Sequence, residues 1–353
     1  MTKRIAVIAG DGIGIDVTVE ALKALDAVRS TDGLDIEWVE MPYGADHYLE
    51  TGITMPEEQV EEFREDYDAI FLGAVGDPRI PDMIHGREIL LGLRFKLDLF
   101  INFRPIKLLD PALCPLKGRG VDDICFEVFR ENTEGLYVGI GGIFKKGTPD
   151  EIALQESVNT RKGVERIIRA AFEHAEAQGH DRVCMSNKSN ALRFGHDLWD
   201  RTFEEVGAEH PGIAKHHWYV DALVMQMVKR PEQFQTIVTS NMFGDIITDL
   251  GAQFQGGLGL AASANIHPGK VSLFEPVHGS APKYHNKNVA NPMAAILSAA
   301  MLLSHVGLPE SAARVERAVA ESYHQGICTK DLGGDRGTTE VGDRVAGLIR
   351  DRV

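Results

Sequence analysis

Short apolar runs alternate along the chain with segments in which apolar residues recur every three or four positions. The runs at residues 4–10 (RIAVIAG), 67–76 (YDAIFLGAVG) and 235–239 (QTIVT) have the length of buried strands. Residues 160–179 show helical spacing and end in a glycine, which is typical of an amphipathic helix and its stop. Strands that alternate with helices predict a three-layer α/β fold.

Two segments depart from this alternation. Residues 291–307 (NPMAAILSAAMLLSHVG) are strongly apolar and predict a buried helix in a largely helical C-terminal third. The polar residues 142–151 (GIFKKGTPDE) predict an excursion such as a hairpin arm. Because no repeat or low-complexity linker is evident, we expect one large domain or two closely connected lobes.

Charge and cysteine content narrow the class of protein. The chain has 353 residues and a formal net charge of −15, so it repels nucleic acid and anionic membranes, and we expect neither as a partner. Its four cysteines are scattered without CxxC spacing, and we expect reduced core thiols in a cytoplasmic protein. The first apolar run is too short for a signal peptide, and no run approaches a transmembrane length.

Two aspartates stand four residues apart in the stretch SNMFGDIITDLGA, residues 240–252. In a helix beginning near Asp245, Asp245 and Asp249 would stack about 5–6 Å apart on one side. The opposite side would hold Ile246, Ile247, Leu250 and Phe254. The pair is either a solvated helix face or half of an oxygen-ligand site for Mg²⁺ or Mn²⁺. A third acid, Asp221, lies at a strand-to-helix junction, where it is either a further ligand or a helix cap.

Several basic residues lie near the ends of predicted strands. Arg94, Arg104 and Arg130 would form a carboxylate clamp, because a guanidinium grips a carboxylate with two hydrogen bonds; singly, each would be an ordinary surface residue. Lys188 follows the run RVCMSN and would accept a proton if a nearby divalent cation lowered its pKa; otherwise it is a solvated loop residue. Tyr137 either donates a proton or simply packs.

The turn GDGIG, residues 10–14, looks at first like a dinucleotide fingerprint. It lacks the GxGxxG spacing, and no acid about 20 residues later ends a second strand. We therefore interpret it as a tight turn between a strand and a helix, and the fold as not a Rossmann fold.

Taken together, these motifs resemble the β-decarboxylating dehydrogenase family, which comprises isocitrate, 3-isopropylmalate, homoisocitrate and tartrate/D-malate dehydrogenases. The matching stretches run along nearly the whole chain, and SNMFGDIITDL and FEPVHGSAP are specific in combination. The resemblance implies an isopropylmalate dehydrogenase-like three-layer fold of two lobes. Residues 1–100 with 252–353 would bind the nucleotide, and residues 101–251 would form the dimerisation and metal/substrate lobe.

The resemblance also implies roles for individual residues. Arg94, Arg104 and Arg130 would bind substrate, Tyr137, Lys188 and Asp221 would be catalytic, and a metal ion would be held by Asp221, Asp245 and Asp249. Lys188 and Asp221 would come from the partner subunit of a homodimer. The nucleotide would be bound by Ala74, Val75, Asn190, Glu275, His278, Gly279, Ser280, Ala281, Lys283, Tyr284 and Asn291. The activity implied is oxidative decarboxylation of a 2-hydroxy acid, with hydride transfer to NAD(P).

Substrate choice would be made on the helix GREILLGLR, residues 86–94. Leu90 and Leu91 would share a face with Arg94 and form an apolar wall that suits 3-isopropylmalate, or they would simply be core. Tartrate/D-malate dehydrogenases also resemble this segment, so their substrates are the alternative. The serine and asparagine with which isocitrate enzymes bind the third carboxylate of their substrate are missing from this helix. A non-catalytic regulatory subunit is disfavoured because Tyr137, Lys188 and the metal aspartates are all present.

The nucleotide loop, residues 278–292, carries Lys283 where NAD-using relatives place an aspartate, and Tyr284 follows it, as in NADP-using isocitrate enzymes. A cation and a phenol suit a 2′-phosphate, which favours NADP slightly over NAD. Alternatively, Lys283 is a plain surface residue.

Overall fold

The structure is a computed structural model that describes residues 2–352, and the chain forms two compact units. Unit 1 comprises Met1–Leu99, Lys107–Val121 and Ala252–Val353, and unit 2 comprises Phe100–Ile106 and Asp122–Gly251. The boundaries expected from the sequence place residues 107–121 in the second lobe instead. Lys107, the first of these residues, contacts unit 1: it donates its backbone N–H to Gln255 Oε1 at 2.8 Å, and its Nζ pairs with Glu316 at 3.0 Å.

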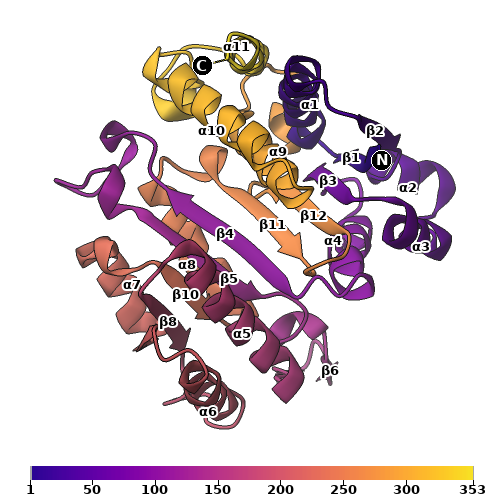
Figure 1. Ribbon diagram of the computed structural model, residues 1–353. Coiled ribbons are helices and arrows are strands. Elements are labelled where there is room, and N and C mark those ends of the chain that lie inside the picture. Colours follow the sequence, from indigo (N-terminus) through magenta and orange to yellow (C-terminus); the bar gives the residue numbers. More distant parts are fainter. Residues whose placement is uncertain (1, 353) are drawn as a thin grey trace. The chain divides into compact units, whose positions relative to one another are not determined.

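Unit 1 is built on a mostly parallel sheet (Figure 1). Its strands lie in the order β2 (Ile36–Met41), β1 (Lys3–Gly10), β3 (Ala69–Ala74), β12 (Ser272–Pro276) and β11 (Ala262–Ile266). Strand β1 runs parallel to β2 and β3, β12 runs parallel to β3, and β11 is antiparallel to β12. Parallel neighbours need crossover connections, which explains the alternation of strands and helices in the sequence.

The helices of unit 1 pack against this sheet or against one another. They are α1 (Ile13–Asp32), α2 (Ala45–Thr51), α3 (Glu57–Asp66), α4 (Ile84–Lys96), α9 (Met293–His305), α10 (Pro309–His324) and α11 (Thr338–Arg350). Short 3₁₀ turns are η1 (Pro111–Leu113), η5 (Leu258–Leu260), η6 (Pro282–Tyr284) and η7 (Lys330–Leu332). Helix α9 packs against β11, β12 and α1, and it is buried as its apolar sequence predicted.

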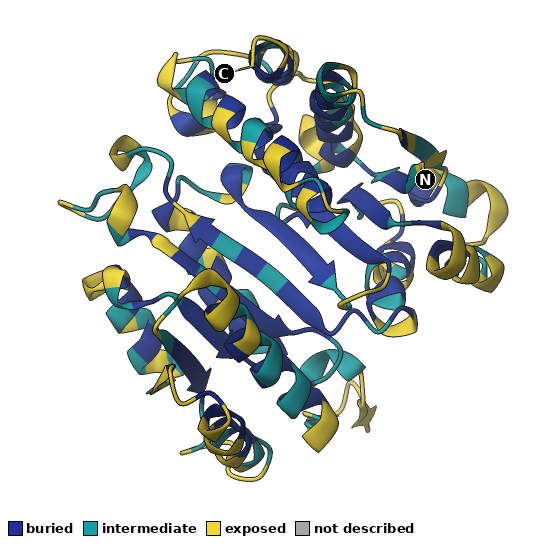
Figure 2. Cartoon of the chain, viewed as in Figure 1, coloured by how far each residue is buried: buried dark blue, intermediate teal, exposed yellow. Residues whose placement is uncertain are grey.

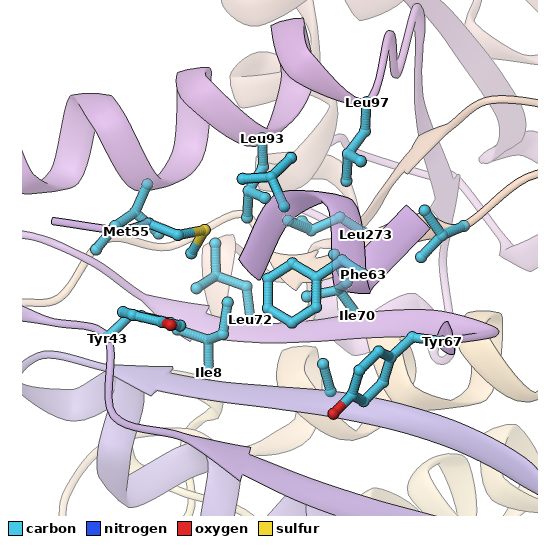
Figure 3. Close-up of a cluster of buried hydrophobic side chains, with 14 of the residues drawn as sticks. Ile8, Tyr43, Met55, Phe63, Tyr67, Ile70, Leu72, Leu93, Leu97 and Leu273 are labelled. Carbon is cyan, nitrogen blue, oxygen red and sulfur yellow. The ribbon is translucent and has the colours of Figure 1, made fainter. Parts of the chain in front are cut away.

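One apolar core of unit 1 lies between the sheet and helices α3 and α4 (Figure 3). Alternate residues of β1 and β3, such as Ile8 and Leu72, point into it, because side chains of a strand alternate between its two faces. Phe63 of α3 and Leu93 of α4 close it from the other side. Leu93 directly precedes Arg94, so this packing fixes the helix that carries the arginine.

The glycine turn between β1 and α1 has the role that the sequence indicated. Gly10 and Gly12 have φ of 73° and 56°, which L side chains rarely adopt. A Cβ on Gly10 would lie 2.0 Å from Ala74 O, and one on Gly12 would lie 2.1 Å from Ser280 O. The turn needs glycines because its backbone approaches the backbone of Ala74 and of Ser280 too closely for a side chain to fit.

The strands of unit 2 are again flanked by helices (Figure 1). The strands lie in the order β4 (Ile101–Lys107), β5 (Cys125–Glu131), β10 (Thr236–Thr239), β8 (Arg182–Asn187) and β9 (Ala214–Tyr219). The helices are α5 (Arg161–Gln178), α6 (Gly195–Ala208), α7 (Val220–Lys229) and α8 (Asn241–Phe254), with 3₁₀ turns η2 (Val121–Asp123), η3 (Leu136–Val138) and η4 (Pro231–Gln233). Helix α5 ends at Gly179 in a left-handed cap, as predicted.

A separate hairpin of β6 (Gly141–Phe144) and β7 (Ile152–Gln155) projects from unit 2, which confirms the expected arm. Every residue of both strands is exposed, and Figure 2 shows the hairpin in yellow. Apolar side chains are exposed on it, among them Phe144 and Leu154 at 62% each. Two isolated strands are marginally stable at best in water, so we expect another surface to cover this arm.

Two expectations from the sequence are corrected. Helix α8 begins at Asn241 rather than near Asp245, and Ile246 is 54% exposed although the adjacent Ile247 is fully buried. Ile246 lies beside the buried stripe of α8 rather than on it. The cysteines are all free, but only Cys184 and Cys328 are buried, whereas Cys125 is exposed at the start of β5.

Candidate active site

Helix α8 holds a cluster of charged side chains within unit 2. Arg130 at the end of β5 donates from Nη1 to Asp245 Oδ1 at 2.5 Å, and Arg104 of β4 places Nη2 3.4 Å from the same oxygen. Tyr137 donates its hydroxyl hydrogen to Asp245 Oδ2 at 2.9 Å. Two predicted substrate arginines, the predicted catalytic tyrosine and a predicted metal ligand are thus brought together.

Both arginines of this cluster are buried, so their charges need partners. Arg130 is held by Asn241, whose Oδ1 accepts from Nε at 3.0 Å and from Nη2 at 2.8 Å. Arg104 donates from Nη1 to Thr248 Oγ1 at 2.6 Å. Asn241 and Thr248 were not identified from the sequence, because an amide or a hydroxyl within a helix gives no signal of what it will contact.

The glycine of the motif SNMFGD also has a packing role. A Cβ on Gly244 would lie 2.4 Å from Cγ and 2.6 Å from Cβ of Arg130. The stem of Arg130 therefore crosses α8 where the helix has no side chain, and this close approach lets its guanidinium reach Asn241 and Asp245.

Asp249 lies one helical turn after Asp245 and is exposed. Its pKa is raised above the ordinary value, first by partial burial and then by the neighbouring charge of Asp245, while Arg104 and Arg130 oppose the rise. A divalent cation between the two carboxylates would offset their repulsion, and hard cations prefer such oxygen ligands. The donor set of α8 thus fits Mg²⁺ or Mn²⁺.

Lys188 and Asp221 form a second cluster in unit 2. Lys188 follows β8, Asp221 lies in the first turn of α7, and Nζ is 2.7 Å from Asp221 Oδ2. The hydrogen bond from Lys188 holds the pKa of Asp221 below its usual value. The N-cap of α7 is Tyr219, so Asp221 is not the capping residue. Among residues 2–352, no three His, Cys, Asp or Glu side chains gather in a group that could hold a metal ion.

In unit 1, Arg94 of α4 is buried and donates from Nη2 to Glu275 Oε1 at 2.9 Å. Glu275 also accepts from Asn265 Nδ2 at 2.8 Å. The Nε of Arg94 is buried and has no hydrogen-bond partner within residues 2–352. An unpaired buried donor costs free energy unless a ligand satisfies it, so this nitrogen is suited to a bound anion.

The leucines before Arg94 differ in their surroundings. Both are half-buried, but Leu90 packs against the core of unit 1 shown in Figure 3. Its role is at least partly structural, as the alternative interpretation held, and Leu91 remains the better candidate for an apolar wall.

The candidate nucleotide residues of unit 1 surround the turn after β12. Ala74 ends β3 and leads into Val75; Ser280 O accepts from Ile13 N at 2.7 Å. Ala281 has φ of 34°, a conformation rare for a residue with a Cβ and often found at functional sites. His278 Nδ1 lies 3.1 Å from Gly279 O; burial lowers its pKa, and its Nε2 has no hydrogen-bond partner within residues 2–352.

Four other candidate nucleotide residues have different surroundings. Lys283 and Tyr284 are exposed in η6, with Lys283 Nζ 4.7 Å from the centre of the Tyr284 ring. Asn291 is buried and already bonded at both ends of its amide, to Asp331 at 3.0 Å and to Met293 N at 3.0 Å. Asn190 is exposed in the loop after β8, in unit 2.

Sequence reasoning missed a buried carboxylate beneath the glycine turn. Asp11 accepts hydrogen bonds from Ala45 N at 2.6 Å and Gly76 N at 2.7 Å, and its Oδ2 lies 3.0 Å from His85 Nε2. It therefore ties the turn to the start of α2, to the loop after Val75 and to the start of α4. The motif AGDGIG was visible, but three partners 34 to 74 residues away in sequence could not be read from it.

A two-unit α/β fold with buried arginines and two stacked carboxylates suits an enzyme that binds a carboxylate substrate together with a divalent cation. The family model described as isocitrate/isopropylmalate dehydrogenase matches residues 4–345. The chain therefore belongs to the isocitrate/isopropylmalate dehydrogenase family, which confirms the predicted family, fold class and enzyme class: a decarboxylating dehydrogenase that uses a metal ion and a nicotinamide nucleotide.

Individual relatives cover almost the whole chain. The chain is 45% identical to a 3-isopropylmalate dehydrogenase of Thermobifida fusca, over 99% of each chain, and 47% identical to one of Corynebacterium glutamicum, over 98% of this chain and 99% of that one. Among solved structures, isocitrate dehydrogenase from Methylococcus capsulatus matches with a TM-score of 0.89 and 35% identity, over 99% of this chain and 100% of the other. Within residues 2–352, no helix is both long and apolar enough to cross a membrane.

Proposed function

We propose that this chain oxidises 3-isopropylmalate at C2 and removes its β-carboxylate, using Mg²⁺ or Mn²⁺ and a nicotinamide nucleotide, as in leucine biosynthesis. The observation that carries the proposal is the convergence of Arg104, Arg130 and Tyr137 on Asp245, one turn before Asp249. The full-length similarity to 3-isopropylmalate dehydrogenases supports the choice of substrate.

The side chains of unit 2 provide binding and proton transfer. Arg104 and Arg130 present buried guanidinium groups to substrate carboxylates, with Arg94 of unit 1 as a third donor. Asp245, Asp249 and Asp221 would hold the metal ion, which supplies Lewis-acid polarisation of the C2 oxygen when bound. Lys188 Nζ takes the proton of the C2 hydroxyl as hydride leaves C2 for the nicotinamide. After CO₂ departs, the Tyr137 hydroxyl protonates the resulting enol carbon.

We further propose a homodimer in which Lys188 and Asp221 serve the partner's site. The observation that supports it is that apolar side chains are exposed on the hairpin arm and on α7, where Met225 is 63% exposed. A second copy of this chain would cover these surfaces. We place the dimer in the cytoplasm, where free cysteines such as the exposed Cys125 stay reduced.

Tartrate or D-malate is the alternative substrate. Arg87 is exposed on α4, seven residues and about two turns before Arg94, with Leu91 between them on the same side. A second guanidinium on that side would suit a substrate with a polar group where 3-isopropylmalate is apolar.

For the nucleotide, Lys283 and Tyr284 favour NADP over NAD. Both are exposed and in contact, so a cation is available for a 2′-phosphate without burial. Exchanging Lys283 for aspartate should shift kcat/KM toward NAD, because a carboxylate repels the phosphate and binds the ribose hydroxyls. An unchanged NADP to NAD ratio would remove Lys283 from the site.

A substrate panel tests the proposal as a whole. We expect the largest kcat/KM with 3-isopropylmalate in the presence of Mn²⁺, and little activity on isocitrate. A higher kcat/KM on D-malate or tartrate would replace the proposed substrate with the alternative.

Lys188→Ala should lower kcat by about 10²-fold or more without unfolding the protein; near-normal turnover would refute the role of Lys188 as proton acceptor.

A further inference from the structure

The loop that carries Lys188 is held by the first turns of helix α6. The backbone N–H of Lys188 donates to His196 Nδ1 at 3.0 Å. The preceding Asn187, fully buried at the end of β8, donates from Nδ2 to Asp200 Oδ1 at 2.6 Å. His196 and Asp200 are four residues apart, so one face of α6 contacts two consecutive residues of the loop.

The chemical state of His196 follows from this contact. A backbone N–H can only donate, so Nδ1 must offer its lone pair and the ring proton must reside on Nε2. His196 is 3% exposed, and burial lowers its pKa to about 4. The imidazole is therefore a neutral acceptor over the whole range in which such an enzyme works.

The same loop is held from the side of β9. Asn187 Oδ1 lies 2.9 Å from His217 Nε2 and accepts the backbone N–H of Ser189 at 3.2 Å. The His217 ring meets Tyr219 edge to face at 5.2 Å, and Lys188 Nζ lies 5.8 Å from the Tyr219 ring centre. The residues on both sides of Lys188 are thus held by hydrogen bonds, while the Lys188 side chain itself is long and flexible.

We propose that His196 is a positioning residue for Lys188: by accepting the Lys188 amide hydrogen, it fixes where Nζ stands relative to Asp221. The ring also meets the apolar Phe243 of α8 edge to face, with the ring centroids 5.5 Å apart, and this contact does not require an imidazole. The inference depends on the proposed role of Lys188 as proton acceptor. Misplacement of a reacting group by about 1 Å can cost 10²-fold in rate.

Two variants of the full-length enzyme test this role. His196→Leu removes the acceptor while filling the space, and we expect kcat to fall about 10- to 100-fold with little change in the KM of the hydroxy acid. His196→Asn places Oδ1 where Nδ1 stood, so it should recover most of kcat. Hydrogen–deuterium exchange of the Lys188 amide, measured without substrate, should be faster in His196→Leu than in His196→Asn.

A matched control is available at His210, just after α6. It is also a buried histidine, with Nδ1 2.8 Å from Glu176 Oε1 and its ring stacked on Phe172. His210→Leu should lower stability without lowering kcat or loosening the Lys188 amide. If His196→Leu does not fold, His196→Ser, too short to reach the amide, takes its place.

The possible outcomes separate the positioning role from the proposed function. Wild-type kcat in His196→Leu, or equal losses in the leucine and asparagine variants with unchanged amide exchange, would overturn the positioning role while leaving the proposed function intact. If the unaltered protein oxidised no 2-hydroxy acid with any nucleotide, the proposed function would fall, and this inference with it.

Discussion

Arg130 and Asn241 are joined by two hydrogen bonds to one oxygen: Nε and Nη2 of the guanidinium donate to Asn241 Oδ1 at 3.0 and 2.8 Å. Asn241 Nδ2 in turn donates to Glu134 O at 3.1 Å, in the loop that leads to Tyr137. The first residue of α8 thus orients both an arginine and the segment before the tyrosine.

This relationship predicts the effect of Asn241→Ala. The substitution leaves buried donors of Arg130 without their acceptor, which costs about 1–3 kcal/mol of unfolding free energy. It should also raise the KM of the hydroxy acid about tenfold, because a misdirected guanidinium binds a carboxylate less well. Kinetics and urea denaturation measure the two effects.

Asn159→Ala is the matched control, since Asn159 Oδ1 accepts from Trp199 Nε1 at 3.0 Å, and Trp199 is not a predicted site residue. It should affect stability alone. Equal effects of both variants on KM would contradict the positioning of Arg130 by Asn241.

The stacked carboxylates predict metal dependence. Asp249→Asn should weaken Mn²⁺ binding by at least about tenfold in titration calorimetry, because the amide removes one negative charge from the ligand set. Asp197→Asn, which alters an exposed ion pair with Arg201, is the control and should bind Mn²⁺ normally.

A chelator should abolish turnover, and Mg²⁺ or Mn²⁺ should restore it; activity that persists in the chelator would exclude the proposed chemistry.

A shared active site predicts complementation between inactive variants. Lys188→Ala and Asp245→Asn homodimers should each be inactive, but after subunit exchange about a quarter of the sites combine intact contributions from both chains. Activity of the mixture measures this recovery. Because Lys188 and Asp221 lie 2.7 Å apart in one chain, mixing Lys188→Ala with Asp221→Asn should recover nothing. Recovery in both mixtures, or in neither, would argue against the shared site.

His196 predicts how stability depends on pH. Its pKa of about 4 in the folded chain is below the ordinary histidine pKa of 6.5, so between these values the unfolded chain binds a proton that the folded chain does not. Stability due to His196 is therefore present above pH 6.5 and lost as the pH falls toward 4, by about 2 kcal/mol from pH 7 to pH 5. Urea denaturation of the unaltered protein and of His196→Asn at both pH values isolates the contribution of His196 to the unfolding free energy. If the unfolding free energies of the two proteins depended on pH identically, this prediction would be contradicted.

Much of the candidate site can be anticipated from sequence because its residues lie at ends of strongly patterned elements. Lys188 directly follows the apolar strand β8, and Asp221 lies in the first turn of α7. The i, i+4 spacing of Asp245 and Asp249 is enough to place them one helical turn apart. What the periodicity did not predict was Ile246, which is apolar but exposed beside them.

The contacts that orient these groups could not be derived in the same way. Asn241, Thr248 and His196 lie on helices and act on residues 8 to 144 positions away in sequence. Nothing in their neighbours distinguishes them from ordinary polar residues, because an acceptor is defined by the donor that folding brings to it. The same holds for Asp11, whose partners come from three other segments of unit 1.

The order of amino acids alone specifies the alternation of strands and helices, the acidic charge, and the types of side chain available for chemistry, because these depend on local periodicity and composition. Which of those side chains meet is settled by folding in three dimensions. Folding buries Arg104 and Arg130 against Asp245, joins Lys188 to Asp221, and selects the polar residues that hold them. A buried charge or donor must find its partner in space, and that partner is set by the packing of the whole unit.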